Sequence, residues 1–541
     1  MLGLACLAVA VRLLSIDASG GLGAALGYDD GVYFAATNAL VHGLLPYHDF
    51  VFLHPPGILL IGAGPVGLAH WIGLDDAQTL ALVRAMFVGL GALNTVLVFL
   101  AGRHLSRVAG LSAALLYAMW LPAVRPERSI LLEPVVALGT LAALALLPPI
   151  TTRTTSGWWR PLAAGLLGGL AIATKLWAVV PILVVALGLV VVRRWRTATV
   201  YIASALASLA LCVTPFLVLT GDRLWQMVVT NQLERPPMGD SRWNRLALIL
   251  GLDGAPLSHL ISPTPPADLH LRTVVREAFL ATDRAHLVVA SLAAAAAVVA
   301  VIVAIRLPVA RIWVILLVVQ VAVLMKVPTF FVGYPQFAAP ALTLVAGAGV
   351  HLCWTVLGRI EWAPVRLVAR GGVALLAGAA LTAFAAGLAT TRMGWHFDPA
   401  IRRGVAGATC VAADFPSDLA LANRLSSNLS NGCAPVVDFT GLVYVMDHPT
   451  EGPITTTDLR LHTPQFQDFA VAYFGSADYV ILRRWIVDGL DRQTMRTLRD
   501  RPRVYTGPPR VYGRGQRQDR ADPPARPTST ARDLLNGDDV R

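Results

Sequence analysis

The chain has 541 residues, of which 55% are hydrophobic and only 14% are charged, and its mean hydropathy is +0.61. These values lie outside the range of soluble globular domains and indicate a membrane protein with many helical spans. The net charge of +11 does not require a nucleic-acid partner. Arginines in loops that face anionic lipid, together with a basic tail, account for it.

Apolar stretches predict about eleven transmembrane helices, because each is long enough, or nearly long enough, to cross a bilayer. The segment 161–192 can be read as two short helices or as one long tilted helix, and the second reading would reverse the orientation of every later loop. The predicted spans are residues 1–16, 79–102, 107–121, 130–149, 161–176, 177–192, 198–220, 286–305, 310–327, 335–357 and 368–391.

Arginine placement orients these helices, since cytoplasmic loops carry an excess of Lys and Arg. Alternate short loops hold most of the arginines, with Arg125 and Arg128 as exceptions in a loop assigned to the outside. The pattern predicts a multi-pass protein of the cell membrane with a cytoplasmic amino terminus. The outer loops are then 17–78 and 221–285, and everything after residue 391 is extracytoplasmic. Alanine richness and the preference for Arg over Lys suggest a high-GC bacterium, which makes the outer side periplasmic.

After the transmembrane part, 1–391, the composition changes. Short strands alternate with helices, which predicts a small extracytoplasmic α/β domain over 392–512. The stretch 513–541 is rich in Arg, Asp, Pro and Gly and is expected to be disordered. The expected strands are 410–414, 435–439 and 479–482, and the expected helices are 416–426, 466–474 and 489–499.

Two cysteines, Cys410 and Cys433, are the only ones in this outer domain. An oxidising compartment favours their pairing as a disulfide, and their spacing matches no zinc pattern. The alternative is two unrelated thiols at strand ends.

A polar segment rich in carboxylates follows the first apolar helix, where buried and unpaired carboxylates would be costly. It contains Tyr28-Asp29-Asp30-Gly31-Val32-Tyr33, then Pro46-Tyr47-His48-Asp49-Phe50 and His54-Pro55-Pro56-Gly57. It resembles the first outer loop of the GT-C membrane glycosyltransferases, most closely the branch of protein O-mannosyltransferases and lipid A aminoarabinose transferases. That branch carries an Asp-Glu or Asp-Asp pair, a Tyr a few residues later and a Pro-Pro element. A basic residue often precedes the Pro-Pro element, and here that residue is His54.

The resemblance implies an inverting glycosyltransferase that takes its sugar from a polyprenyl-phosphate donor and acts at the outer face. An acceptor hydroxyl loses its proton as it attacks the anomeric carbon, so a carboxylate base is needed within hydrogen-bond reach. By resemblance Asp29 is that base, and Asp30 positions the acceptor or orients Asp29. Tyr33 and Asp49 are assigned to substrate binding. The alternative for the Asp pair is a turn that caps the next helix, since Asp-Gly is typical of turns.

The leaving lipid phosphate needs positive charge. The chain has only two lysines, Lys175 and Lys326, both at predicted outer ends of helices. Lysine is a compact point charge suited to phosphate, and both lysines are assigned to donor phosphate together with Arg125, Arg128 and His54. The alternative for the lysines is snorkelling to the interface.

Three further residues complete the predicted site. Glu127 supports the acceptor or forms a local ion pair with Arg128. Tyr334 and Gln336, in an outer segment that resembles one before a late helix of this superfamily, are assigned to donor phosphate or sugar.

This interpretation requires no metal or cofactor, and binding of a divalent cation by Asp29, Asp49 and His54 is the open alternative. The expected partners are membrane lipids, the lipid-linked donor and an acceptor that is an envelope glycan, a glycolipid or a protein. Walker-type loops and Gly-x-Ser-x-Gly elbows are absent from the sequence. A transporter or flippase of polyprenol-linked sugars is the second reading, and a non-catalytic envelope assembly protein is the third.

Overall fold

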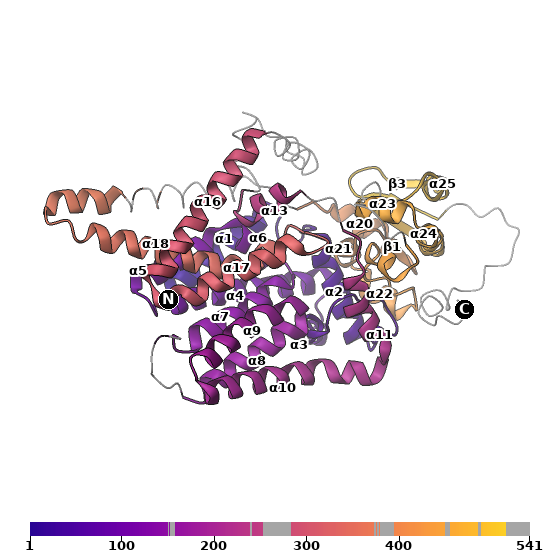
Figure 1. Ribbon diagram of the computed structural model, residues 1–541. Coiled ribbons are helices and arrows are strands. Elements are labelled where there is room, and N and C mark those ends of the chain that lie inside the picture. The colour runs from indigo at the N-terminus through magenta and orange to yellow at the C-terminus, as the bar shows by residue number, and fades with distance from the viewer. Residues whose placement is uncertain are drawn as a thin grey trace, which may run out of the picture. The chain divides into compact units, whose positions relative to one another are not determined.

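The structure, a computed structural model, describes residues 1–149, 151, 157–237, 241–252, 283–372, 375, 378, 394–448, 455–484 and 488–514 (Figure 1). The chain divides into two compact units, and the division falls within two long helices. Unit 1 comprises Met1–Ser19, Ala85–Cys212 and Asp240–Met393; unit 2 comprises Gly20–Arg84, Val213–Gly239 and Gly394–Arg541. The segment 20–84, most of which lies in the predicted first outer loop 17–78, therefore belongs to the same unit as the carboxyl-terminal part.

Unit 1 is a helical bundle. Its helices form over apolar runs, and several of them, such as α4, α9 and α18, end at arginine-bearing loops. They are α1 (Leu2–Asp17), α4 (Asp76–Gly102), α5 (Arg107–Met119), α6 (Leu121–Glu127), α7 (Glu133–Leu146), α8 (Trp159–Thr174), η1 (Leu176–Ala178), α9 (Val179–Val191), α10 (Trp195–Thr220), α13 (Arg242–Ile249), α16 (Asp283–Arg306), η3 (Pro308–Ala310), α17 (Arg311–Lys326), η4 (Tyr334–Phe337) and α18 (Ala339–Leu357).

Each of the first ten predicted spans contains a helix of the structure, whereas the eleventh, 368–391, lies largely outside the described residues. Within the described part of the chain, five helices are long and apolar enough to cross a membrane, or six if the bent pair α5 and α6 is one span. The protein is thus a largely helical protein with several apolar spans.

The segment 161–192 forms two helices rather than one. The backbone is extended at Lys175, between α8 and η1. A Cβ atom on Gly168 would lie 2.9 Å from the Ile182 side chain, so α8 and α9 fold back against each other. The open alternative of a single long helix is excluded by this contact.

Small residues let the helices of unit 1 approach closely. A Cβ on Gly139 of α7 would meet Ala171 of α8 at 2.7 Å, and a Cβ on Gly347 of α18 would meet the Ala109 carbonyl of α5 at 2.5 Å. Close backbone approach at small residues is a common basis for helix association in membranes.

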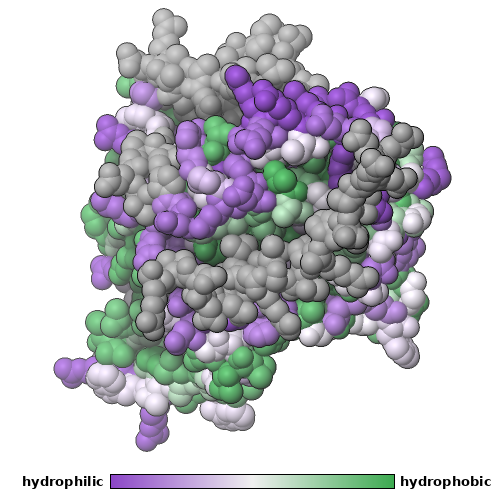
Figure 2. All heavy atoms as spheres, turned by 90° about the vertical axis from the view of Figure 1, so that its right-hand side faces the viewer, coloured by the Kyte–Doolittle hydropathy of each residue, from purple (hydrophilic) through white to green (hydrophobic). Residues whose placement is uncertain are grey.

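Apolar side chains also lie on the outside of the long helices. Leu211 and Val218 of α10 are 78% and 77% exposed, and Leu287 of α16 is 69% exposed. Figure 2 shows one face of the molecule, on which apolar residues gather in green patches apart from the purple hydrophilic ones. Helices with such outer surfaces are suited to contact with lipid.

Unit 2 begins with two helices that lie inside the predicted first outer loop, α2 (Tyr28–Val41) and α3 (Gly57–Trp71). The apolar helix α3, of 15 residues, is absent from the predicted spans. The remaining elements are α11 (Asp222–Trp225), η2 (Gln226–Thr230), α12 (Asn231–Leu233), α20 (Pro399–Gly404), β1 (Val411–Ala413), α21 (Pro416–Leu421), α22 (Leu425–Ser430), η5 (Gly441–Val445), α23 (Thr456–Leu461), α24 (Pro464–Ser476), β2 (Tyr479–Leu482), α25 (Arg492–Arg499), β3 (Arg503–Tyr505) and β4 (Arg510–Tyr512).

Four short strands form one mixed sheet in the order β1-β2-β4-β3. Strands β1 and β2 are parallel, with Ala412 opposite Val480, whereas β4 runs antiparallel to both β2 and β3. The helices α21 to α24 lie along the chain between β1 and β2, as the crossover between parallel strands requires. The predicted α/β character of this part is therefore present.

Two details of the prediction for this part are wrong. The segment 435–439 is not a strand, because Phe439 is buried among aromatic rings, 5.1 Å from Phe466 and 5.1 Å from Phe474, instead of pairing in the sheet. The expected helix 416–426 is two helices, since Asn423 has φ of 55° and interrupts the turn between them. The hairpin of β3 and β4 has no counterpart in the prediction.

Cys410 and Cys433 are joined by a disulfide, with their Cα atoms 5.8 Å apart. The bond ties the start of β1 to the end of α22. The predicted tail 513–541 lies outside the described residues after Arg514.

Candidate functional site

The Asp29-Asp30 pair forms the first turn of α2. Gly27 precedes the helix with extended backbone and no side-chain cap. Carboxylates in a first turn are stabilised by the unpaired N–H groups and the helix dipole. Asp29, Asp30 and Gly31 are helical, so the alternative of a turn that caps the next helix is wrong, and the pair has a fixed helical backbone.

Asp30 is fully buried and forms an ion pair with Arg84. The Arg84 Nε lies 3.2 Å from Asp30 Oδ2, and its Nη1 donates to the Ala24 carbonyl at 2.8 Å and to the Leu22 carbonyl at 2.5 Å. One guanidinium therefore joins the carboxylate to the chain that leads into α2. This arrangement ties Asp30 to the chain that enters α2, and Asp29 beside it is half-buried.

Tyr28 fixes the start of α2 to the carboxyl-terminal part of the same unit. Its hydroxyl donates to Asp438 Oδ1 at 3.0 Å and accepts from the Thr440 N–H at 2.8 Å. Its ring meets Phe415 edge-on at 5.5 Å. Burial raises the pKa of Tyr28 well above its ordinary value, and Asp438 raises it further, so the hydroxyl keeps its proton and the hydrogen bond persists.

Glycine at position 31 allows α2 to lie directly on α21. A Cβ there would come within 2.3 Å of the Ser417 backbone nitrogen and 2.5 Å of its Oγ. Ser417 also lies close to the start of α2 through its Oγ, which is 3.5 Å from the Gly27 carbonyl. Tyr28 and Gly31, on either side of Asp29, thus both contact the carboxyl-terminal part of unit 2.

The loop between α2 and α3 holds the other predicted residues of this segment. The Tyr33 ring contacts the rings of His54 at 5.6 Å and Phe52 at 6.3 Å. Asp49 accepts from the Leu45 N–H at 2.7 Å and lies 2.9 Å from His48 Nδ1. Asp49 therefore shapes its own loop, while Tyr33 and His54 form a small aromatic cluster.

In unit 1, Lys175 lies in a buried cluster at the end of α8. Its Nζ donates to Glu133 Oε1 at 2.5 Å, and it lies 3.9 Å from the centre of the Tyr334 ring and 4.4 Å from that of Trp177. The structure thus brings the predicted residues Lys175 and Tyr334 together. It also adds Glu133 and Trp177, to which the sequence analysis gave no role in the site.

Glu127 is fully buried and pairs with Arg12 of α1, not with Arg128. Its Oε1 accepts from Asn94 at 2.7 Å and from the Tyr117 hydroxyl at 2.8 Å. The Tyr117 hydroxyl in turn accepts from Gln336 at 3.2 Å, so the predicted Glu127 and Gln336 belong to one network. The local pair with Arg128 is wrong, because Arg128 donates instead to the Ser15 carbonyl and to Ser19.

Of the five residues assigned to donor phosphate, only Lys326 has an exposed side chain. It ends α17, where Arg245 donates to the carbonyls of Leu324 and Val327 at 3.2 and 2.7 Å. Cations at a helix carboxyl terminus are favoured by the dipole. His54 and Arg125 are half-buried, and Arg128 and Lys175 are buried.

Two arginines that sequence reasoning missed, Arg12 and Arg84, hold the two buried carboxylates Glu127 and Asp30. Both lie in apolar segments, and an ionisable residue inside such a segment is a signal for a buried partner. The partners could not be read from the sequence, because Glu127 lies 115 residues from Arg12 and Asp30 lies 54 residues from Arg84. Among the described residues, no three His, Cys, Asp or Glu side chains gather in a way that could hold a metal ion.

Comparison by sequence finds no matching family model and no matching curated protein. Comparison by structure finds ArnT from Cupriavidus metallidurans, solved with undecaprenyl phosphate. The likeness covers 94% of this chain and 97% of that chain, with a TM-score of 0.54 and 14% identity.

The chain has the fold of the GT-C glycosyltransferases. An oligosaccharyltransferase from Archaeoglobus fulgidus, in complex with zinc and sulfate, is similar over 89% of this chain and 68% of that chain, with a TM-score of 0.51 and 13% identity. The likeness to ArnT extends over nearly the whole of both chains, so the carboxyl-terminal part of unit 2 belongs to the shared fold. The resemblance inferred from the amino-terminal motif is confirmed at the level of the fold.

Proposed function

We propose that the protein is an inverting glycosyltransferase of the cell membrane that moves a sugar from a polyprenyl-phosphate donor to an acceptor hydroxyl. The acceptor is part of an envelope glycan, a glycolipid or a glycoprotein, on the extracytoplasmic side of a multi-pass protein with its amino terminus inside. A fold similar to that of ArnT over nearly the whole chain supports this proposal. The observation that carries it is the fixed first turn of α2, in which Asp30 forms a buried ion pair with Arg84 and the neighbouring Asp29 is half-buried.

In the proposed step, the acceptor oxygen forms a bond to the anomeric carbon while Asp29 accepts the hydroxyl proton. The bond between the anomeric carbon and the phosphate oxygen breaks, and its electron pair leaves with the polyprenyl phosphate. Attack opposite the leaving group inverts the anomeric configuration. Asp30 acts through Arg84 by holding the first turn of α2.

The leaving phosphate gains negative charge and requires a cation. Lys326 is our candidate for this role, because its side chain is exposed. Lys175 already donates to Glu133 and lies against two aromatic rings, so we assign it to holding Tyr334 in place. Arg125 is a second candidate for phosphate.

The test of the base is transfer from radiolabelled polyprenyl-phosphate sugars in membranes that contain the wild type or Asp29→Asn. Loss of a general base costs roughly 10²–10⁴-fold, and we expect a loss in that range. Asp468→Asn, an exposed carboxylate on α24, is the matched control and should transfer normally. Unchanged transfer by Asp29→Asn would sink the catalytic assignment, and movement of donor across the membrane without product would favour a flippase.

The test of the phosphate site is Lys326→Gln, which should raise the KM for the donor with a smaller effect on acceptor KM. Lys175 needs a paired design, since its removal alone leaves the Glu133 carboxylate buried and unpaired. The double variant Lys175→Met with Glu133→Gln removes both charges together. If that double variant loses donor affinity while Lys326→Gln does not, the phosphate belongs to Lys175.

A further inference from the structure

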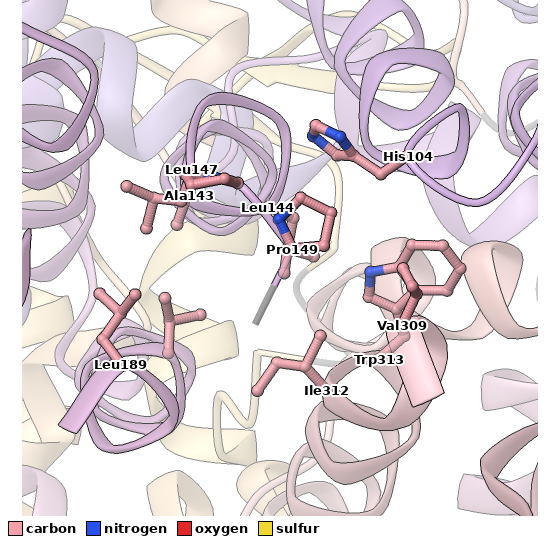
Figure 3. A pocket seen from close by; sticks show the side chains of 11 residues that line it. His104, Ala143, Leu144, Leu147, Pro149, Leu189, Val309, Ile312 and Trp313 are labelled. Atoms are coloured by element: carbon pink, nitrogen blue, oxygen red, sulfur yellow. The ribbon is translucent and has the colours of Figure 1, made fainter. Parts of the chain in front are cut away.

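Unit 1 contains a small apolar pocket between the carboxyl ends of α7 and α9 and the start of α17, with the His104 ring at one side (Figure 3). The pocket encloses about 30 Å³, which is room for about one water molecule. Its size excludes a substrate or a lipid chain. A surface of unit 2 is the better candidate for a further ligand.

The surface formed by α25 and the hairpin of β3 and β4 in unit 2 is strongly cationic. Residues 491–514 contain seven arginines and two aspartates, with no lysine or glutamate. Four of the arginines have exposed side chains and define what we call the basic surface: Arg492, Arg496 and Arg499 of α25 and Arg503 of β3. The first three recur at intervals of four and three residues, which places them on one face of the helix, about 10 Å from first to last.

The arginines of the basic surface are not matched by carboxylates. Among the described residues, none forms an ion pair with any of the four. Two other arginines of the same segment differ, because Arg501 donates to two backbone carbonyls at 2.9 and 3.0 Å and Arg514 lies 3.2 Å from Asp478. Four positive charges therefore share one surface without a carboxylate partner in the part of the chain that the structure describes.

Local structure explains only part of this arrangement. The helix dipole favours cations in the last turn, which accounts for Arg496 and Arg499. Charge on an edge strand discourages pairing with another chain, which accounts for Arg503, because β3 is the last strand of the sheet. Arg492, however, lies in the first turn of α25, where the dipole disfavours a cation. It is also four residues from Arg496, and like charges at that spacing destabilise a helix.

The composition of this surface suits an extended polyanion in water. A guanidinium binds carboxylate and phosphate groups alike through two parallel hydrogen bonds, and a row of about 10 Å suits a ligand with several such groups. Surfaces that bind membranes combine cations with exposed aromatic or large apolar side chains. Residues 491–514 are all described, and Val504 is the only large hydrophobic residue among them with an exposed side chain. A polymer is therefore favoured over a lipid surface.

We propose that the basic surface binds an acidic polysaccharide of the cell envelope. For this the carboxyl-terminal part must face the envelope, which rests on the orientation in the proposed function and not on Asp29 as the base. The surface lies at the β3 edge of the sheet, whereas α21, which contacts α2, follows β1 at the other edge. Three strand spacings of about 4.8 Å, or about 14 Å, separate the two edges, so the basic surface is distinct from the turn that carries Asp29.

The test is binding of the full-length protein, reconstituted in nanodiscs of phosphatidylcholine, to polygalacturonate, to neutral dextran of similar length and to vesicles of phosphatidylglycerol. Wild type should bind polygalacturonate at least about tenfold more tightly than dextran, equivalent to about 1.4 kcal/mol. The difference should shrink as salt rises from about 0.1 M to about 1 M, because the Debye length falls from about 10 Å to about 3 Å. Equal binding of the two polymers, or binding to the vesicles but not to polygalacturonate, would overturn the assignment.

Two triple variants separate the basic surface from the net charge of the protein. The first removes three charges from α25: Arg492→Gln, Arg496→Gln and Arg499→Gln. The matched control removes the same charge from exposed arginines of unit 1: Arg193→Gln, Arg196→Gln and Arg359→Gln. The first should bind polygalacturonate at least about tenfold more weakly, and the control should bind as the wild type does. Equal losses in the two would refute the site.

A single variant guards against a loss of folding in the first triple variant. Arg492→Glu places a carboxylate in the first turn of α25, where the dipole favours it, so it should be at least as stable as the wild type. It must still weaken binding of polygalacturonate by at least about threefold, in the range of exposed charge contacts. Wild-type binding by this folded variant would refute the proposal. Asp29→Asn should bind polygalacturonate as the wild type does, so a failure of the proposed chemistry and a failure of this surface give different results.

Discussion

Replacing Gly31 by Ala tests whether the carboxyl-terminal part of unit 2 positions the candidate base. The new Cβ would lie 2.3 Å from the Ser417 nitrogen, against an ordinary contact of at least 3.4 Å, so α2 must withdraw from α21 by about 1 Å. Backbone atoms of Ser417 cannot rotate away as a side chain could. Because Asp29 is in the same helical turn, it must move with the helix.

The expected magnitude follows from two opposed effects. Overpacking costs typically about 1–3 kcal/mol, and alanine in a helix regains about 0.5–1 kcal/mol over glycine. We expect a net loss of stability of about 1–2 kcal/mol. A displacement of about 1 Å at a reacting group can lower the rate roughly 10²-fold, so the loss of transfer should exceed what the loss of folded protein explains.

The assay combines thermal unfolding, hydrogen exchange of α2, and transfer from the radiolabelled donor at a temperature where all variants are folded. The matched control is Gly64→Ala in α3, where a Cβ meets no atom within 4 Å. We expect that control to be as active as the wild type and slightly more stable. Ser417→Gly should not rescue Gly31→Ala, because it removes the hydroxyl but leaves the backbone nitrogen. Normal transfer and normal exchange by Gly31→Ala would refute the positioning argument.

Two further predictions concern buried charges. Gly91→Ala places a Cβ 2.3 Å from Arg12 Nε and 2.8 Å from Glu127 Oε2, so it should lower stability by about 1–3 kcal/mol, as overpacking next to a buried pair does. Gly89→Ala in the same helix, which meets nothing within 4 Å, should leave the thermal midpoint unchanged or raised, and equal midpoints for the two would contradict the prediction. Burial raises the pKa of Asp488 from 3.8 to about 6. The protonated carboxyl group therefore contributes its full stabilisation below a pH of about 4, and this stabilisation is lost as the pH rises through about 6. Asp488→Asn should therefore stabilise the protein at pH 7 by up to about 3 kcal/mol and flatten the dependence of the thermal midpoint between pH 4 and 7, whereas a midpoint equal to that of the wild type at pH 7 would argue against a buried charge there.

The positions of the helices and two strands were readable from sequence, because they depend on short-range patterns. Runs of apolar residues marked ten helices of the structure, and Val411–Ala413 and Tyr479–Leu482 form strands where the sequence placed them. Failures occurred where a distant element decided the outcome, as at Phe439, whose burial is provided by aromatic rings and not by a sheet. The apolar helix α3 was not predicted, because the segment that contains it was assigned whole to the first outer loop.

The candidate site, too, has features that the sequence shows and features that only the tertiary structure shows. A carboxylate pair at a helix start, followed by Tyr33 and a Pro-Pro element, was recognisable in the sequence as a catalytic motif. That Asp30 pairs with Arg84 was decided only by the tertiary structure, since Arg84 reaches Asp30 from 54 residues away.

The sequence by itself thus determined the membrane class, the helical plan and the motif, because hydropathy and turn chemistry act over a few residues. The tertiary structure decided the pairing of charges: Arg84 with Asp30, Arg12 with Glu127 and Lys175 with Glu133. Burying a charge is costly unless a partner neutralises it. Each of these three buried carboxylates therefore takes the cation that the fold brings to it, and no local pattern encodes that choice.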